Sequence, residues 1–190
     1  MIGPVIGPVI SAVRAMARGV RDDRRGAALI EFAMVLPVLL LLFLGGYQLS
    51  DASACKRKVT ITARALADIT SQYTTLTKSE ADTVLAAAQQ IMAPYDLANA
   101  EVRVSQITLT STGKKGAKIV WSRARNTTER AVNSVVTEFP ADLRLAKGDT
   151  YIYAEVSYNY DPKIGNLVPP VSFEQTLYML PRKSAKVTLQ

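Results

Sequence analysis

The sequence predicts an α+β fold, in which a long N-terminal transmembrane helix continues into a head with a small antiparallel β-sheet. Three patterns predict it. An apolar run extends from Ala27 to about Leu49, a stripe of apolar residues at helical spacing follows it as far as Leu76, and alternation typical of strands begins at Glu101. Of the 190 residues, those beyond the apolar run are numerous enough to form one domain with its own core.

The apolar run has the length of one membrane crossing, which takes about 20 helical residues. Its only charged residue is Glu31, and the chain has no second run of this length. A carboxylate within a membrane span costs about 2.5–3.5 kcal/mol on insertion scales, so an acid there indicates a function. The alternative for the apolar run is a buried core helix of a soluble protein. The alternative for Glu31 is a tolerated residue near the membrane interface.

A secretory signal is another reading of the same region. Ala52-Ser53-Ala54 has the small-residue pattern of a signal-peptidase site, and Cys55 follows it as a candidate for lipid attachment. Against this reading, the apolar run is longer than the roughly 7–15 residues of a signal peptide, and Glu31 and Pro37 are unusual inside one. The sequence therefore favours a retained span over a cleaved signal.

The apolar stripe after the span predicts that the helix continues to about Leu76. Its members recur at spacings of three and four: Val59, Ala63, Leu66, Ile69, Tyr73 and Leu76. Thr77 and Glu80 then have the spacing of a capping box, which predicts a second helix that Pro94 closes. The predicted inner face of this helix consists of Val84, Leu85, Ala88, Ile91 and Met92.

The remaining chain predicts the strands of the sheet. Expected strands are 118–123, 151–160, 173–180 and 185–189, besides the one that starts at Glu101. In that first strand Val102 and Val104 differ in parity from the apolar pair at 107 and 109, so a bulge near Ser105-Gln106 is expected to bring them to one face. We expect a short helix over 129–139, ended by Pro140.

Composition excludes several classes of function. The chain has no histidine and a single cysteine, so it lacks histidine-based catalysis, internal disulfides and cysteine-rich zinc sites. We therefore expect no enzyme, no catalytic residues, no cofactor and no metal. The net charge is +7, of which residues 1–26 carry +3 and the remainder +4, an ordinary surface charge, and no basic–aromatic pattern suggests nucleic acid. Ser53 and Lys56 have the spacing of a serine–lysine hydrolase without its companion motifs.

A family resemblance rests on the residues around the start of the span. Arg25-Gly26-Ala27-Ala28-Leu29-Ile30-Glu31-Phe32-Ala33-Met34-Val35-Leu36-Pro37 resembles the TadE-like proteins of the tight-adherence (Tad, or Flp-type) pilus. These are pseudopilins, or minor pilins, and a long N-terminal helix followed by an antiparallel sheet is the pilin architecture. The resemblance covers about 25 residues and is vague over the head, so it implies more about the span than about the head.

The resemblance implies the organisation and the role of the chain. Residues 1–26 would be a leader, 27–49 the transmembrane helix, 50–76 its periplasmic extension and 77–190 the head. A prepilin peptidase would cut between Gly26 and Ala27, and Glu31, Phe32 and Pro37 would serve assembly. The implied partners are the membrane, the peptidase, other pilins or pseudopilins and the pilus assembly platform.

The implied location is the bacterial inner membrane, crossed once, with the N-terminus cytoplasmic and the C-terminal domain periplasmic, and incorporation into the pilus is compatible with it. Five arginines precede the span against two aspartates, which favours this orientation, whereas Lys56, Arg57 and Lys58 after the span weaken the bias. The alternative function is an uncleaved, membrane-anchored periplasmic binding or scaffold domain.

Overall fold

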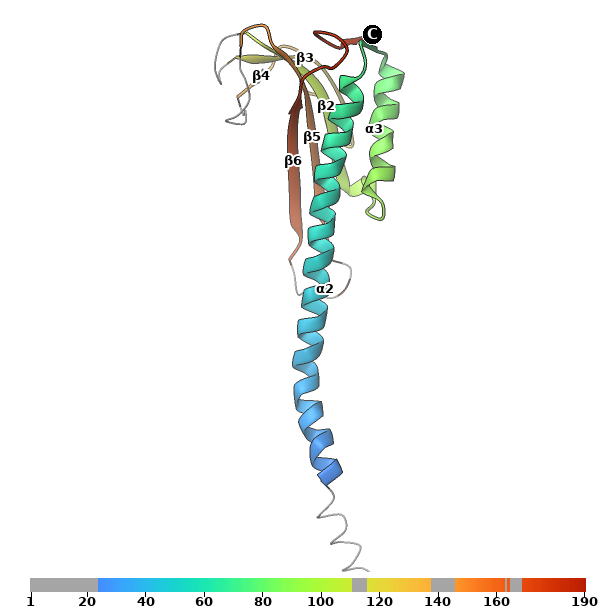
Figure 1. Cartoon of the computed structure of the whole chain (residues 1–190), viewed down its shortest axis with the longest axis vertical. Coiled ribbons are helices and arrows are strands. Elements are labelled where there is room, and N and C mark those ends of the chain that lie inside the picture. The colour runs from blue at the N-terminus through green and yellow to red at the C-terminus, as the bar shows by residue number, and fades with distance from the viewer. Residues whose placement is uncertain (1–23, 111–115, 138–145, 163, 165–168) are drawn as a thin grey trace, which may run out of the picture. The chain divides into compact units, whose positions relative to one another are not determined.

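The computed structural model describes residues 24–110, 116–137, 146–162, 164 and 169–190. Most of the expected leader, residues 1–23, lies outside the described residues. The chain divides into two compact units, Met1–Tyr47 and Gln48–Gln190, and each is described by itself. The elements in chain order are α2 (Arg24–Ser71), β1 (Thr75–Leu76), α3 (Lys78–Met92), the short 3-10 helix η1 (Leu97–Asn99), β2 (Ala100–Leu109), β3 (Ala117–Arg125), β4 (Val135–Val136), β5 (Thr150–Tyr160), β6 (Val171–Met179) and β7 (Thr188–Leu189) (Figure 1).

The first unit consists of the apolar part of α2, which continues through Pro37. The second unit, which we call the head, contains the rest of α2 and all later elements. Together they confirm the predicted α+β class, a long apolar N-terminal helix followed by an antiparallel sheet. The helix ends at Ser71 and not near Leu76 as expected, because Leu76 lies in β1, which pairs in parallel with β7 near the C-terminus.

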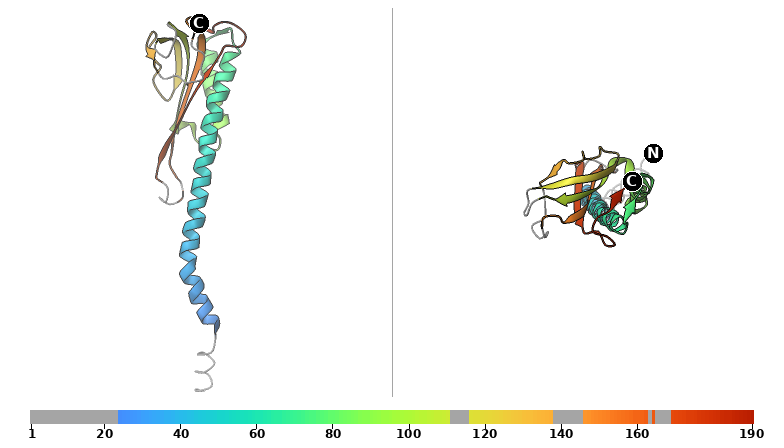
Figure 2. Two further views of the ribbon diagram at one scale, coloured as in Figure 1. Left: turned by 60° about the vertical axis from the view of Figure 1, so that its left-hand side comes forward. Right: turned by 90° about the horizontal axis from the view of Figure 1, so that it is seen from above.

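The main sheet of the head has five antiparallel strands in the order β4-β3-β2-β5-β6. Figure 2 shows α2 and α3 together on one side of it. The main core lies between these helices and the inner face of the sheet, and every second residue of β5 from Ile152 to Tyr160 belongs to it. In α2 the residues buried in this core are Ala52, Cys55, Val59, Ala63, Leu66 and Ala67.

The second helix forms as the sequence predicts. Thr77 caps α3, its side chain accepts from the backbone N–H of Glu80, and the Glu80 carboxylate accepts from the backbone of Thr77, which completes the capping box. These bonds hold the pKa of Glu80 below its usual range. Of the predicted inner face, only Ile91 is half-buried, while the others are buried.

A register shift lies between Gln106 and Ile107, close to where the sequence predicts a bulge, but the extra residue is in β3 and the effect on β2 differs from the one expected. β2 pairs with β5 in unbroken register, so Val104 faces the main core whereas Ile107 faces the opposite side of the sheet. The register shift lies between β2 and β3, where one extra residue, Val120, is accommodated. The expectation that one face would collect all four apolar residues of β2 is therefore wrong, because a second small core covers the outer face. Its buried members are Ile107, Leu109, Ala117, Ile119, Val136, Tyr151 and Tyr153.

The expected short helix over 129–139 is also wrong for the described residues 129–137. This segment passes along the edge of β3 instead and forms β4. The N–H of Ile119 donates to the carbonyl of Ser134 over 3.0 Å, and the N–H of Asn133 donates to the carbonyl of Ile119 over 2.8 Å. Backbone pairing with the sheet has thus replaced the local hydrogen bonds of a helix.

Candidate functional site: the apolar segment and its junction with the head

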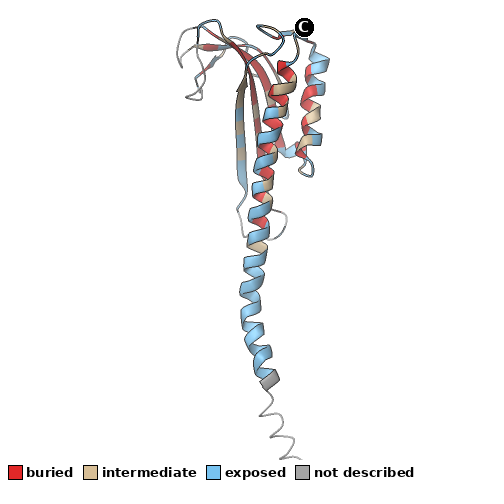
Figure 3. Cartoon of the chain, in the orientation of Figure 1, coloured by how far each residue is buried: buried red, intermediate tan, exposed pale blue. Residues whose placement is uncertain are grey.

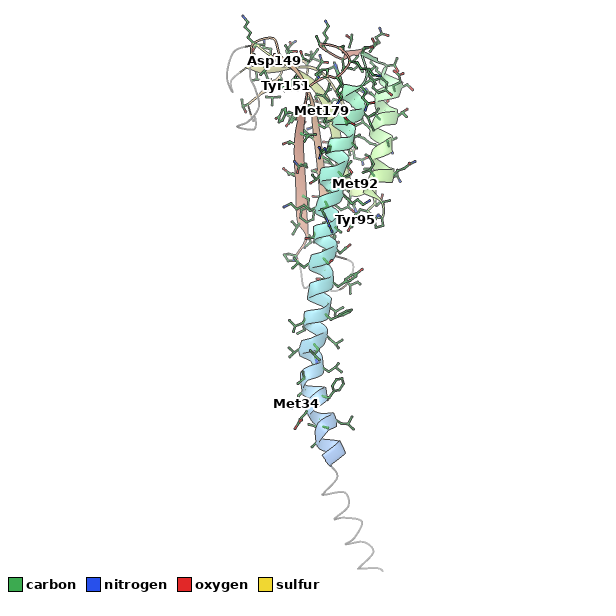
Figure 4. The ribbon with its side chains drawn as sticks, viewed as in Figure 1. Met34, Met92, Tyr95, Asp149, Tyr151 and Met179 are labelled. Carbon is green, nitrogen blue, oxygen red and sulfur yellow. The ribbon has the colours of Figure 1, made fainter. Side chains whose placement is uncertain are left out.

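The apolar segment of α2 has no internal partner. Within Gly26–Ser71 one stretch is long and apolar enough to cross a membrane, and none of that stretch is buried. Figure 3 shows this part of the helix exposed on all sides, while the later part is buried along one face. Met34 is 75% exposed and projects away from the helix (Figure 4). A helix apolar on every side and unburied suits lipid or the spans of other subunits, which disfavours the core-helix reading.

The expected processing site lies in the first turns of this segment. Gly26 and Ala27 are exposed. A Cβ atom built on Gly26 would meet nothing within 4 Å, so packing inside the chain does not account for a glycine there. Its backbone conformation does not require glycine either, because it lies within the helix. Neither packing against described residues nor backbone conformation thus explains a glycine at position 26.

The three expected assembly residues lie on the same exposed helix. Glu31 is exposed and has no hydrogen bond or ion pair with any described residue. Phe32 is 57% exposed, and Pro37 lies inside the helix, where it cannot donate a backbone hydrogen bond to Ala33. All three are therefore exposed on the helix.

The junction with the head contains a cluster that the sequence did not reveal. Asp51 of α2 accepts hydrogen bonds from two tyrosines that are far away in the chain. The hydroxyl of Tyr95 donates to the backbone carbonyl of Asp51 (2.9 Å) and to its Oδ1 (2.8 Å). The hydroxyl of Tyr160 donates to Oδ2 of Asp51 (2.8 Å). Burial, and then the bond to Asp51, raises the pKa of Tyr95 above its usual range. This cluster fixes the first turn of α2 within the head.

The junction argues against the secretory readings. A cut after Ala54 would remove Asp51 and leave both tyrosine hydroxyls without their acceptor. Cys55 is fully buried, and burial, followed by the charge of Asp51, raises its pKa to about 11. A thiol in this state is a core residue and a poor nucleophile or attachment point.

The outer face of the sheet carries the most concentrated polar network of the head. Glu155 of β5 pairs with Arg103 of β2 over 3.1 Å and with Arg130 over 2.6 Å. Burial by itself would raise the pKa of Glu155, but the bonds and charges of Arg130 and Arg103 outweigh it and lower the pKa. Arg130 also lies over the ring of Tyr153, which stacks on Tyr178. Each charge here has a partner, which is typical of a structural network.

The described residues contain no group of three or more cysteines and acidic residues that could hold a metal ion. Ser53 and Lys56, which have a hydrolase-like spacing, are both exposed on α2. The features that the structure leaves unexplained are therefore the exposed apolar segment, Gly26 and Glu31.

Comparison with known proteins gives one match. The family model for TadE-like proteins matches residues 26–68, from the expected processing site into the head part of α2. The resemblance found in the sequence is thereby confirmed over this segment. The match is limited to this segment, and the head beyond residue 68 lies outside it. Among the described residues, one helix contains a stretch long and apolar enough to cross a membrane. No curated protein and no solved structure matches the chain.

Proposed function

From this TadE-like segment, we propose that the chain is a minor pilin, or pseudopilin, that takes part in assembly of a Tad pilus after a prepilin peptidase has cut between Gly26 and Ala27. The observation that carries the proposal is the exposed apolar part of α2. It starts at Gly26, where the match to the TadE-like family model also starts. Such a helix needs lipid before assembly and the helices of other subunits after it. Assembly of a pilus requires a subunit whose helix can leave the lipid and pack against the helices of other subunits.

The proposed topology follows from the charges around the span. The arginine-rich leader stays in the cytoplasm, the helix crosses the inner membrane once, and the head folds in the periplasm. The peptidase, the assembly platform and other pilins are the proposed partners. The span would be 27–49, and the later turns of α2 would hold the head.

Glu31 has a specific role in this proposal. The cut gives Ala27 a free α-amine, and Ala27 and Glu31 are four positions apart, which places them on one side of the helix. The carboxylate can therefore neutralise its own amine or that of a neighbouring subunit. Because an unpaired charge in lipid costs far more than a paired one, such pairing would fix the axial register between packed spans.

N-terminal sequencing of the protein from membranes tests the processing step. We expect the mature chain to begin at Ala27. Gly26→Leu should leave the precursor uncut, since the peptidase must approach the backbone closely there. Gly46→Leu is the matched control, because a Cβ there also meets nothing within 4 Å, and it should be processed normally. A start at Met1 in the wild type would instead support the uncleaved scaffold, and a start at Cys55 a signal peptide.

Replacement of Glu31 tests the assembly step. Glu31→Gln keeps the shape and removes the charge, so insertion should become easier, by up to about 3 kcal/mol, and the variant should accumulate and be processed. Surface pili should nevertheless decrease, because the pairing with the amine is lost. Glu31→Asp should be intermediate, as the charge stays and the reach shortens. Normal piliation by Glu31→Gln, counted beside a blot for mature protein, would show that the acid is a bystander.

A further inference from the structure

The two edges of the main sheet differ in how they are protected. At one edge, β4 pairs with Ala117 and Lys118, and the segment before it continues along β3 through the bonds between Ile119 and residues 133–134. The N–H of Arg130 extends this cover with a bond to the Ser122 hydroxyl. The first residues of β3, Ala117 to Ile119, are therefore closed to a further strand. Covering an edge in this way is how natural proteins avoid unwanted strand pairing.

The opposite edge, β6, has no such cover among the described residues. β6 pairs with β5 in unbroken register over its whole length, from Val171 to Met179. In the described part of the chain no backbone group from another element bonds to its outer side. β6 also contains no lysine, no proline and no bulge, which commonly protect an exposed edge, and its one charged residue, Glu174, lies on the outer face of the sheet.

Outward-facing backbone groups on β6 can be identified near its middle. The side-chain Nε2 of Gln175 donates to the carbonyl of Thr176 over 3.0 Å, so this carbonyl points away from β5. In an antiparallel strand the N–H and C=O of one residue face the same neighbour. The N–H of Thr176 therefore also faces the free edge and is available to a further strand.

A basic side of α2 borders this edge. Thr60 hydrogen-bonds the side chain of Gln175 over 3.3 Å, which places this side of α2 beside β6. Ser53, Lys56, Arg57 and Thr60 line one shallow hollow here, and Arg64 is exposed one turn further along. Among the described residues none of these three cations forms an ion pair. We call Lys56, Arg57 and Arg64 the basic rim.

We propose that the free edge of β6 and the basic rim together bind an extended, acidic segment of another pilus component by strand addition. The segment would continue the sheet beyond β6, and its acidic side chains would meet Lys56 and Arg57. Strand addition gains affinity from backbone hydrogen bonds and specificity from alternate side chains. This inference rests on the proposed function in one respect only, that the acidic segment belongs to another pilus component.

Charge also argues against a second copy of this chain as the occupant. Pairing of β6 with β6 of another copy would bring two basic rims toward each other, and like charges at an interface disfavour binding. Continuation of the sheet from β6 to β3 of another copy is disfavoured by the cover on β3. The proposal also accounts for the cations just after the span, which oppose the bias of the leader and otherwise have no role.

Peptide binding to the full chain in detergent tests the proposal. The probe is a short fluorescent peptide of alternating glutamate and valine, followed by anisotropy, with a peptide of alternating lysine and valine as its control. We expect saturable binding of the first and not of the second. Thr176→Pro removes one outward N–H at an edge position that tolerates proline, so affinity should fall about tenfold, the equivalent of one hydrogen bond.

A paired set of charge variants separates the basic rim from general attraction. Lys56→Gln with Arg57→Gln should weaken binding several-fold and reduce its dependence on salt. Lys78→Gln with Lys118→Gln makes the same change of charge at exposed sites elsewhere on the head and should leave binding unchanged. Absence of saturable binding, equal binding by Thr176→Pro with native circular dichroism, or equal binding of the lysine peptide would overturn the proposal.

Self-association is the remaining outcome. If the wild type forms dimers that Thr176→Pro abolishes and the glutamate peptide does not compete, the occupant is a second copy and the proposal is wrong. Failure here would not bear on processing, because the N-terminal residue of the mature chain is measured independently. A chain cut at Ala27 that binds no acidic strand would refute the edge site and leave the pilin function standing.

Discussion

The two parts of α2 form one continuous helix but differ in burial. In the described residues before Tyr47 the helix is apolar apart from its first turns and Glu31, and none of its membrane-length stretch is buried. After Gln48 one face of the helix is buried in the head, and Cys55, Ala63 and Leu66 on this face are fully buried. The exposed face carries the basic rim. The same secondary structure therefore serves two environments. Mutations in the first part should affect assembly, and mutations in the second should affect folding.

The sharpest test of this comparison replaces one leucine in each part. Leu66 is fully buried and Leu40 is 50% exposed. Leu66→Ala should lower the free energy of unfolding of the head by about 3 kcal/mol, because it leaves a cavity in the core, whereas Leu40→Ala should leave it unchanged. Fluorescence of Trp121, the single and buried tryptophan, reports unfolding of the head alone. A comparable loss in both variants would break the comparison.

The polar network of the head should give the next largest effect. Glu155→Gln removes the charge that two arginines share and should cost about 2 kcal/mol, less than a fully buried pair because Arg130 is partly exposed. Since the folded pKa of Glu155 is lowered from 4.5, its contribution is complete above that pH and is lost as the pH falls through the folded pKa. The wild type should therefore lose stability below about pH 4.5, and the variant should lose less.

Glu174→Gln is the control for this pH dependence. Glu174 is exposed on the same face of the sheet and forms no ion pair with a described residue. Its replacement should leave both the stability at neutral pH and the acid limb of the unfolding curve as in the wild type. Identical acid limbs for the wild type and Glu155→Gln would show that the network does not stabilise the head.

The junction between the two parts should give the smallest change. Tyr95→Phe removes a hydroxyl that donates to Asp51 and should cost about 1 kcal/mol, the typical value of one hydrogen bond. Tyr47, which precedes the head part of α2, is 52% exposed, and Tyr47→Phe should have no effect on unfolding. Equal unfolding curves for the two variants would mean that this bond does not hold the first turn of the head part of α2.

Patterns within single elements predicted most of the fold. The apolar run, the capping box at Thr77 and the alternation over 151–160 depend on neighbours in the sequence, and each is confirmed. The errors arise where distant segments compete with local preference. The helix stops at Ser71 because the carbonyl of Ser71 accepts from Arg182 and β1 pairs with β7, and neither partner can be recognised from the residues around 71.

The candidate sites, too, were predictable where the signal is local in the sequence and were missed where it depends on distant residues. Glu31 was found because an acid in an apolar run is conspicuous by itself, and its role stays a prediction. Asp51 was missed because its importance comes from Tyr95 and Tyr160, which lie 44 and 109 residues away. The free edge of β6 was missed for a related reason. Whether a strand is at an edge depends on the order of the whole sheet, which alternation within one strand does not encode.

The C-terminal segment has a consequence for the biosynthesis of the head. The N–H of Val187 donates to the side chain of the buried Gln106, its carbonyl accepts from the indole of Trp121, and residues 188–190 bond to residues 74–78. A chain made from its N-terminus holds Gln106 and Trp121 unpaired until these residues emerge. The head therefore cannot be completed before Val187 has been made, and a subunit truncated before Val187 would expose an unfinished core to proteases.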